Sequence, residues 1–173
     1  IAKNFETLEP GVAFRTLRTF LGDTYGSGWH KRVIVTGTPN MQLHDMSEKY
    51  GFTFLPFPED VGGRYTALTP VGLLPMAVAG FDICALVQGA ADMESLLRSD
   101  SSQDNMALRY AALRNYLYRA GYSVEMLSFF GPRFFRLAKW WVQLFGESEG
   151  KGGLGIFPSF ASYSEDLHSI GQF

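Results

Sequence analysis

Apolar residues recur every three or four positions near the start of the chain. Over residues 7–22 this spacing, with Pro10 in the first turn, predicts an amphipathic helix that ends at Gly22. Residues 22–30 are rich in glycine and in short polar side chains. They are therefore expected to form a loop.

A strand–helix–strand pattern follows this segment. The β-branched run over residues 32–37 is typical of a strand that is buried on both faces of a parallel sheet. Pro39 and Asn40 open a short helix that reaches Tyr50, and residues 52–57 are a second strand candidate. Alternation of this kind predicts an α/β fold in which helices flank a parallel sheet.

The composition changes after Arg64. Residues 70–97 are apolar and rich in small side chains, and three glycines interrupt two predicted helices, so we expect buried, close helix contacts there. Residues 98–105 are polar. They predict a solvated loop between two halves of the chain.

The second half restarts the alternation of helices and strands. A helix is predicted over residues 105–120, a strand over residues 123–130, and another helix from Pro132. The last helix carries an aromatic stripe that includes Trp140 and Trp141, which we expect in the core.

The composition narrows the class of protein. The 173 residues are 46% hydrophobic and 18% charged, which allows a sizeable core and excludes disorder as the main state. The net charge of −2 argues against a nucleic-acid partner. The single cysteine, Cys84, excludes an intramolecular disulfide and is expected to be a small buried hydrophobe. The histidines lie too far apart for a local zinc motif, so no metal is expected.

No apolar run approaches the roughly 20 residues that span a bilayer, so no membrane partner is expected. Ile1 falls at what reads as the end of a strand, and Phe173 falls inside a helical pattern. We therefore expect an internal piece of a longer, soluble protein.

Two carboxylates, Glu147 and Glu149, end the helix that is predicted from Pro132. The helix dipole disfavours anions there by a few tenths to about 1 kcal/mol, so either solvation accounts for them or one is a general base in a pocket. The run 146–151 is similar to a phosphate-binding loop. However, three rather than four residues separate its glycines, and Gly152 stands where such a loop needs Ser or Thr.

Two further segments carry candidate chemistry. In residues 60–66 a glycine pair that ends at Gly63 permits close backbone approach to a ligand, and Arg64 supplies a fixed cation; the alternative is an ordinary turn with an exposed arginine. His168 follows two acidic residues and is either a proton shuttle or a capping histidine.

Three segments together resemble the bacterial glucose-6-phosphate isomerase family: residues 60–66, 143–151 and 166–172. The resemblance runs in order along the whole chain. It implies two sugar-isomerase (SIS) domains, each with a mainly parallel sheet between helices. Residues 1–68 would end the first domain, residues 69–104 would be a helical connection, and residues 105–173 would begin the second.

The family interconverts glucose 6-phosphate and fructose 6-phosphate in glycolysis and gluconeogenesis, without a metal or organic cofactor. The resemblance therefore implies a cytoplasmic isomerase that works as a homodimer. By resemblance Glu147 is the base that moves a proton between adjacent carbons, and Arg64 stabilises the cis-enediolate. Gln143, one helical turn before Glu147, would contact the substrate or position the base. His168 would open the sugar ring across the dimer interface, together with a C-terminal lysine that is not in this sequence.

The phosphate loop of the family departs from its usual pattern here. The resemblance assigns the substrate phosphate to a hydroxyl-rich loop at a helix N-terminus, and Lys3 and Thr7 match it. Three hydroxyl positions read Ala2, Asn4 and Glu6 instead. We therefore expect weakened phosphate binding or a loop with a shifted register.

Three hypotheses follow from the sequence. The chain belongs to a working isomerase, or to an isomerase-like sugar-binding or regulatory module with an altered phosphate loop, or it is a structural core without activity of its own.

Overall fold

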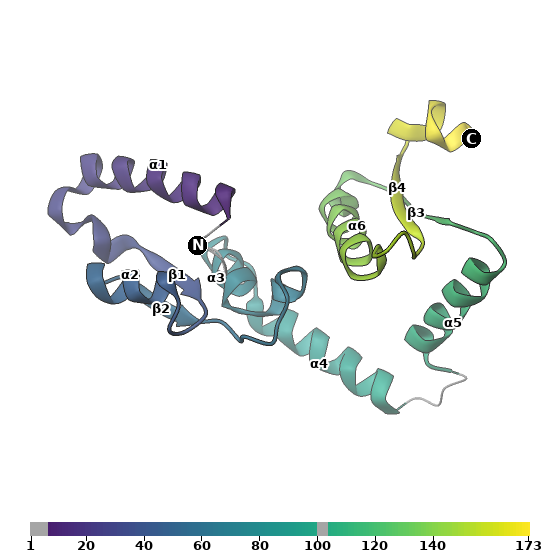
Figure 1. The fold of residues 1–173 in the computed structure, drawn as a ribbon, viewed down its shortest axis with the longest axis horizontal. Helices are drawn as coiled ribbons and strands as arrows, with labels where there is room; N and C mark the ends of the chain where they lie inside the picture. The colour runs from purple at the N-terminus through teal and green to yellow at the C-terminus, as the bar shows by residue number, and fades with distance from the viewer. Residues whose placement is uncertain (1–6, 100–103) are drawn as a thin grey trace. The chain divides into compact units, whose positions relative to one another are not determined.

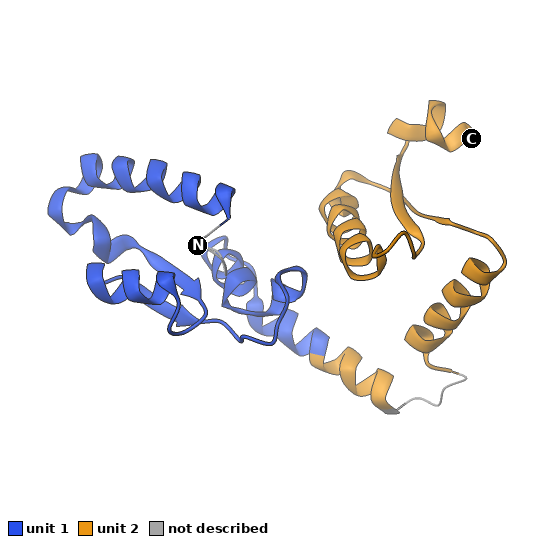
Figure 2. Ribbon diagram, in the orientation of Figure 1, with its two compact units in different colours: residues 1–90 blue, residues 91–173 orange. Residues whose placement is uncertain are grey.

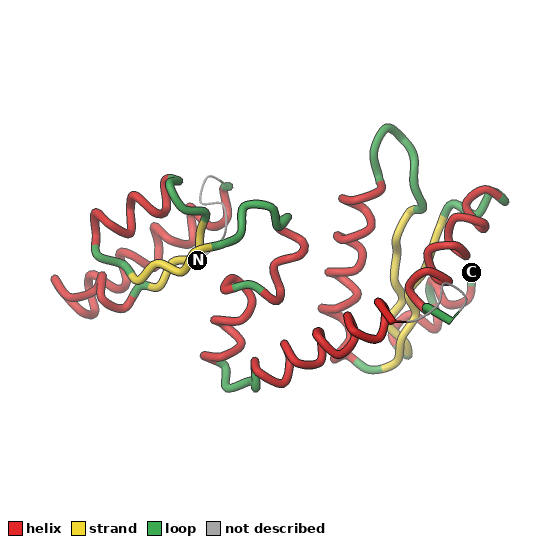
Figure 3. The backbone as a smooth tube through the Cα atoms, turned by 90° about the horizontal axis from the view of Figure 1, so that it is seen from below, coloured by secondary structure: helices red, strands yellow, loops and turns green. Residues whose placement is uncertain are grey.

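The computed structural model describes residues 7–99 and 104–173. It divides into two compact units, residues 1–90 and residues 91–173 (Figure 2). Each unit contains a two-stranded parallel sheet with helices beside it (Figures 1 and 3), so the expected α/β class is confirmed. The division falls within a helix, and the expected domain bounds at 68/69 and 104/105 stay predictions.

The elements are as follows. The α-helices in the described residues are α1 (Leu8–Tyr25), α2 (Gln42–Tyr50), α3 (Pro70–Val78), α4 (Ile83–Ser99), α5 (Met106–Arg119) and α6 (Phe135–Glu149). The strands are β1 (Ile34–Gly37), β2 (Thr53–Pro56), β3 (Val124–Phe130) and β4 (Phe157–Tyr163). The 3-10 helices are η1 (Gly26–Arg32), η2 (Gly63–Leu68), η3 (Pro132–Phe134), η4 (Glu165–His168) and η5 (Ile170–Gln172).

In the first unit β1 pairs with β2 in the register that runs from Ile34↔Thr53 to Gly37↔Pro56. Both predicted strands are confirmed, although β1 begins two residues later than expected because η1 occupies the preceding turn. The core of this unit joins helix, strand and loop side chains, namely Phe14, Val33, Val35, Leu43 and Phe52. The Phe14 and Phe52 rings meet edge to face at 6.0 Å.

The predicted end of α1 is wrong. The helix runs through Gly22, whose carbonyl accepts a hydrogen bond from the N–H of Gly26. Gly26 has a φ of 58°, a conformation that favours glycine, so the helix ends there. The expected loop over residues 22–30 is therefore a helix end followed by η1.

The next helix boundary also differs from the prediction. Asn40 was expected to open the helix but has a φ of 60°, so α2 begins at Gln42 after the extended residue Met41. Asn40 is a residue type that tolerates the left-handed region through local hydrogen bonds, and its N–H lies 3.2 Å from Nδ1 of His44.

The expectation of close, buried contacts over residues 70–97 holds at one glycine only. A side chain on Gly72 of α3 would collide with the carbonyl oxygen of Ala67 in η2, so these two helices do approach closely. Elsewhere the expectation is wrong, because Val78 is 80% exposed and Cys84, expected to be buried, is exposed. Gly80 has open space where a side chain would lie.

In the second unit β3 pairs with β4 over seven residues, from Val124↔Phe157 to Phe130↔Tyr163. α6 packs on β4, and Ala138 and Ala161 are fully buried. Small side chains thus bring helix and sheet together. The aromatic stripe of α6 is less buried than expected: Trp140 is 39% exposed.

One face of β3 is apolar and exposed within this unit. Exposure alternates along the strand, and the outward residues include Val124, Met126 and Phe130. Parallel sheets are usually covered on both faces, so this face lacks its cover among the described residues.

Candidate active site

The last turn of α6 presents Glu147 to solvent. Gln143 lies one helical turn earlier, and its Nε2 donates a hydrogen bond of 3.4 Å to Oε2 of Glu147. The prediction that these side chains share a face is confirmed. On the sheet side of this turn, a Cβ on Gly146 would lie 3.6 Å from Cγ of Pro158 on β4. The helix end is thereby packed on the sheet while the Gln143–Glu147 pair faces outward.

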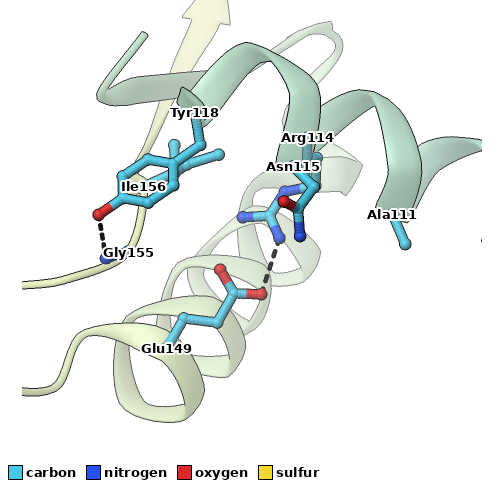
Figure 4. A pocket seen from close by; sticks show the side chains of 7 residues that line it. All are labelled: Ala111, Arg114, Asn115, Tyr118, Glu149, Gly155 and Ile156. Atoms are coloured by element: carbon cyan, nitrogen blue, oxygen red, sulfur yellow. Dashed lines mark hydrogen bonds and ion pairs between the residues drawn. The ribbon is translucent and has the colours of Figure 1, made fainter. Parts of the chain in front are cut away.

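The second carboxylate of this turn has a different environment. Oε1 of Glu149 lies 2.8 Å from Nη1 of Arg114 on α5 (Figure 4). Nε of Arg114 also donates to Oε2 of Glu125 on β3, at 2.6 Å. The ion pair with Arg114 therefore accounts for Glu149 at an unfavourable helix end, and Glu147 is the carboxylate of this turn that stays a candidate base.

The Arg114 side chain is only 11% exposed and is enclosed by aromatic rings. Its guanidinium lies 4.1 Å from the Phe145 ring centroid and 5.6 Å from that of Tyr110. Burial lowers the pKa of Arg114, but the hydrogen bonds to Glu149 and Glu125 outweigh it, so the pKa is raised above the ordinary value. Arg114 therefore stays cationic.

Tyr110 completes this cluster. Its hydroxyl donates to Oε1 of Glu125 at 2.5 Å. Burial, together with this hydrogen bond to Glu125, raises the pKa of Tyr110 from 10.0 to about 12. The phenol therefore stays neutral and acts as a donor.

Sequence reasoning missed this cluster. The signal was the pair of acidic residues at a helix end, where an acidic side chain needs a compensating cation. The sequence did not identify the cation, because Arg114 lies 35 positions from Glu149 and on a different helix.

A pocket of about 230 Å³ opens beside the ion pair (Figure 4). Residues of α5 line one side, and Glu149 and Gly155 line the other. The Tyr118 hydroxyl accepts a hydrogen bond from the N–H of Gly155 at 3.3 Å, which joins α5 to the loop after α6.

His168 belongs to the same unit as Glu147. It ends η4 and is exposed, and its Nδ1 lies 3.2 Å from Nε2 of Gln172. The turn is anchored by Asp166, whose carboxylate accepts hydrogen bonds from the Ser162 N–H at 2.8 Å and from the Ser169 hydroxyl at 3.2 Å. Asp166 thus joins η4, which ends at His168, to β4.

Arg64 and Gly63 lie in the first unit, where they begin η2 after β2. Arg64 is half-buried, and its guanidinium lies 5.4 Å from the Tyr65 ring centroid. A side chain on Gly63 would meet nothing within 4 Å, so open space adjoins this backbone. That Arg64 and Glu147 act on one substrate stays a prediction.

The predicted phosphate site is described in part. Thr7 is extended and precedes α1 as its N-cap residue, at a helix terminus of the kind that attracts anions. Lys3 and the altered positions Ala2, Asn4 and Glu6 lie outside the described residues.

The described residues also bear on metal binding and on membrane insertion. Among residues 7–99 and 104–173, no cluster of three or more His, Cys, Asp or Glu side chains has the arrangement of a metal site. Within these same ranges, no helix combines the length and apolarity needed to cross a membrane.

Relatives of this chain are glucose-6-phosphate isomerases by name. The chain is 46% identical over 176 residues to the glucose-6-phosphate isomerase of Leptospira biflexa, and 45% identical over 175 residues to that of Staphylococcus saprophyticus. Both comparisons cover all of this chain, but only 39% and 40% of the relatives. The chain thus spans about two fifths of their length.

A solved structure and a family model agree with these relatives. The crystal structure of a hypothetical protein from Thermus thermophilus matches 99% of this chain and 42% of its own, with a TM-score of 0.88 and 30% identity. This similarity fits the parallel sheets of partial sugar-isomerase domains. The phosphoglucose isomerase family model matches residues 1–155. The chain therefore belongs to the phosphoglucose isomerase family.

Proposed function

We propose that this chain is part of an enzyme that interconverts glucose 6-phosphate and fructose 6-phosphate. Its relatives at 45–46% identity are named glucose-6-phosphate isomerase. The observation that carries the chemical assignment is the hydrogen-bonded Gln143–Glu147 pair on the outward face of the last turn of α6. Glycolysis and gluconeogenesis in the cytoplasm are the setting that fits this reaction.

In the proposed mechanism Glu147 removes the proton from C2 of the opened glucose phosphate and returns it to C1. One carboxylate serves both steps because the two carbons are adjacent. The first transfer leaves negative charge on the oxygens of a cis-enediolate, and the proton of the C2 hydroxyl passes to the oxygen at C1 before the second transfer completes the ketose. Arg64 would stabilise this charge, because a guanidinium stays protonated and donates several hydrogen bonds.

Binding and ring opening need further groups. Gln143 would hold the Glu147 carboxylate in the orientation that faces the substrate carbons, and Gly63 would allow the substrate to approach the backbone. Lys3 and Thr7 would bind the phosphate near the start of α1. His168 would move the proton that opens the ring, and we propose that it acts across a homodimer interface.

The test is turnover by the full-length protein beside its Glu147→Gln variant. The variant keeps the shape of the side chain but removes the base, so isomerisation should fall by a factor of about 10³ or more. Exchange of the C2 hydrogen with heavy water should be lost in parallel. Glu48→Gln, which changes a side chain 72% exposed on α2, is the control and should retain turnover.

The altered phosphate loop keeps a second candidate function open. By the resemblance, Glu6 would place a negative charge near the expected phosphate. A sugar-binding or regulatory module would bind the sugar phosphate without turnover in either the parent protein or the Glu147→Gln variant. Measurable turnover by residues 1–173 alone would contradict the site described above, because the family's C-terminal lysine lies outside this sequence.

A further inference from the structure

The last turn of α6 is held by contacts with other elements in addition to the hydrogen bonds of the helix. Glu149 is paired with Arg114, and the N–H of Gly150 donates to the carbonyl of Gly146 at 3.0 Å. The loop after α6 approaches the helix end again at Gly155, where a Cβ would lie only 2.9 Å from the carbonyl oxygen of Glu149. The turn that carries Glu147 is therefore fixed from α5 and from the following loop.

Arg114 is the centre of these contacts. It joins three elements, because it lies on α5, binds Glu125 on β3 and binds Glu149 on α6. Its side chain is 11% exposed and packs on Phe145, one helical turn before Glu149. A half-turn shift of α6 would break the ion pair and the ring contact together.

The adjoining pocket does not fit an anionic ligand. Two carboxylates face one guanidinium, so the cluster is negative overall. Nη2 of Arg114 has no hydrogen-bond partner among the described residues. A neutral hydrogen-bond acceptor is enough to satisfy Nη2. The negative charge of the cluster therefore favours a structural role over an anion-binding site.

We propose that Arg114 is a positioning residue for the catalytic base. Through its hydrogen bond to Glu149 it fixes the last turn of α6, and with it the orientation of the Glu147 carboxylate toward the substrate carbons. The inference rests on the proposed function, because Glu147 must be the base for its position to affect the rate. Misplacement by about 1 Å costs up to about 100-fold in rate.

The test measures kcat and KM separately in the full-length protein. Arg114→Met should lower kcat by about 10- to 100-fold and leave KM within about twofold, because it moves the base without removing a substrate contact. Hydrogen exchange at C2 should slow by the same factor as kcat. Arg98→Met removes an ion pair on the exposed surface of α4 and should change neither constant.

A second pair of variants keeps the test valid where Arg114→Met fails to fold. Glu149→Gln keeps an oxygen that accepts from Nη1 of Arg114, whereas Glu149→Leu does not. The glutamine variant should retain most of kcat, and the leucine variant should lose about as much as Arg114→Met. The double variant Arg114→Met/Glu149→Leu should be no slower than the slower single variant, because both remove one contact.

Two results would overturn the proposal. The first is a folded Arg114→Met or Glu149→Leu protein with unchanged kcat. The second is an equal loss for Glu149→Gln and Glu149→Leu, which would make charge rather than the contact decisive. Failure of the proposed function looks different, because the parent protein would then show no turnover, or Glu147→Gln would turn over as fast as the parent, whatever the Arg114 variants do.

Discussion

Nη1 of Arg114 lies 2.8 Å from Oε1 of Glu149, so the middle of α5 is joined to the last residue of α6. The ion pair explains why one of two neighbouring acids stands at a helix end that disfavours it. It also distinguishes the two acids, which the sequence alone did not: Glu149 holds the end of α6 in place, and Glu147 is the candidate general base.

This ion pair should contribute to stability. Arg114→Met leaves Glu125 and Glu149 without their cation, which should lower the free energy of unfolding by about 3 kcal/mol. This value is at the lower end of the range for a broken buried ion pair because Glu149 is partly exposed to solvent. Urea-induced unfolding measures this change. Arg98→Met, which removes an exposed pair, should cost about 0.5 kcal/mol or less. Equal losses for both variants would contradict the greater contribution of the buried ion pair.

Tyr110 should give the protein a distinct response to high pH. Burial and the hydrogen bond to Glu125 raise its pKa from 10.0 to about 12, so the folded protein keeps the proton where the unfolded chain has lost it. This contribution to stability is complete below pH 10 and is lost as the pH rises to about 12.

Ultraviolet absorbance of tyrosinate measures this titration directly. Tyr110→Phe should remove a step near pH 12 and flatten the fall in stability between pH 10 and 12. Tyr116→Phe, at a residue 71% exposed on the same helix, is the control and should leave the step in place. Loss of a step near pH 10 in the Tyr110 variant would contradict the shift.

The proposed ring-opening role of His168 has its own test. His168→Ala should lower turnover of fructose 6-phosphate, because no group would then move the ring-opening proton. An analogue of fructose 6-phosphate that lacks the C5 hydroxyl cannot close its ring, so the variant should convert it at nearly the parent rate. Equal losses on both substrates would assign His168 to binding or to the structure of η4 instead.

The loop after α6 should be sensitive to substitution at Gly155. Its φ is +95°, and a Cβ there would press on the carbonyl oxygen of Glu149, so Gly155→Ala should cost about 2–3 kcal/mol. Gly153 also has a positive φ, +75°, but open space around it, so Gly153→Ala should cost only about 1 kcal/mol. Thermal unfolding compares the two variants. A greater loss at Gly153 would exclude the close contact as the cause.

The sequence predicted the elements well where a local pattern determines them. The β-branched run became β1, and the spacing of Gln143 and Glu147 put them on one helix face. Helix ends were predicted less well, because Gly22 is compatible with a helix interior and the positive φ falls at Gly26 instead.

Contacts between distant segments could not be predicted in the same way. The partner of Glu149 is 35 positions away, and nothing in the spacing of α5 marks Arg114 as different from its other arginines. The burial expected for Cys84 failed for a related reason: an apolar neighbourhood in the sequence does not specify which segment covers it.

The exposed apolar face of β3 has a consequence for biosynthesis. In a chain that is still being synthesised, Val124, Met126 and Phe130 would stay in contact with water for as long as no other segment covers them. Holdase chaperones bind such transiently exposed strands and keep them from associating with other chains. Synthesis of this protein should therefore depend on chaperone supply more than its final stability would suggest.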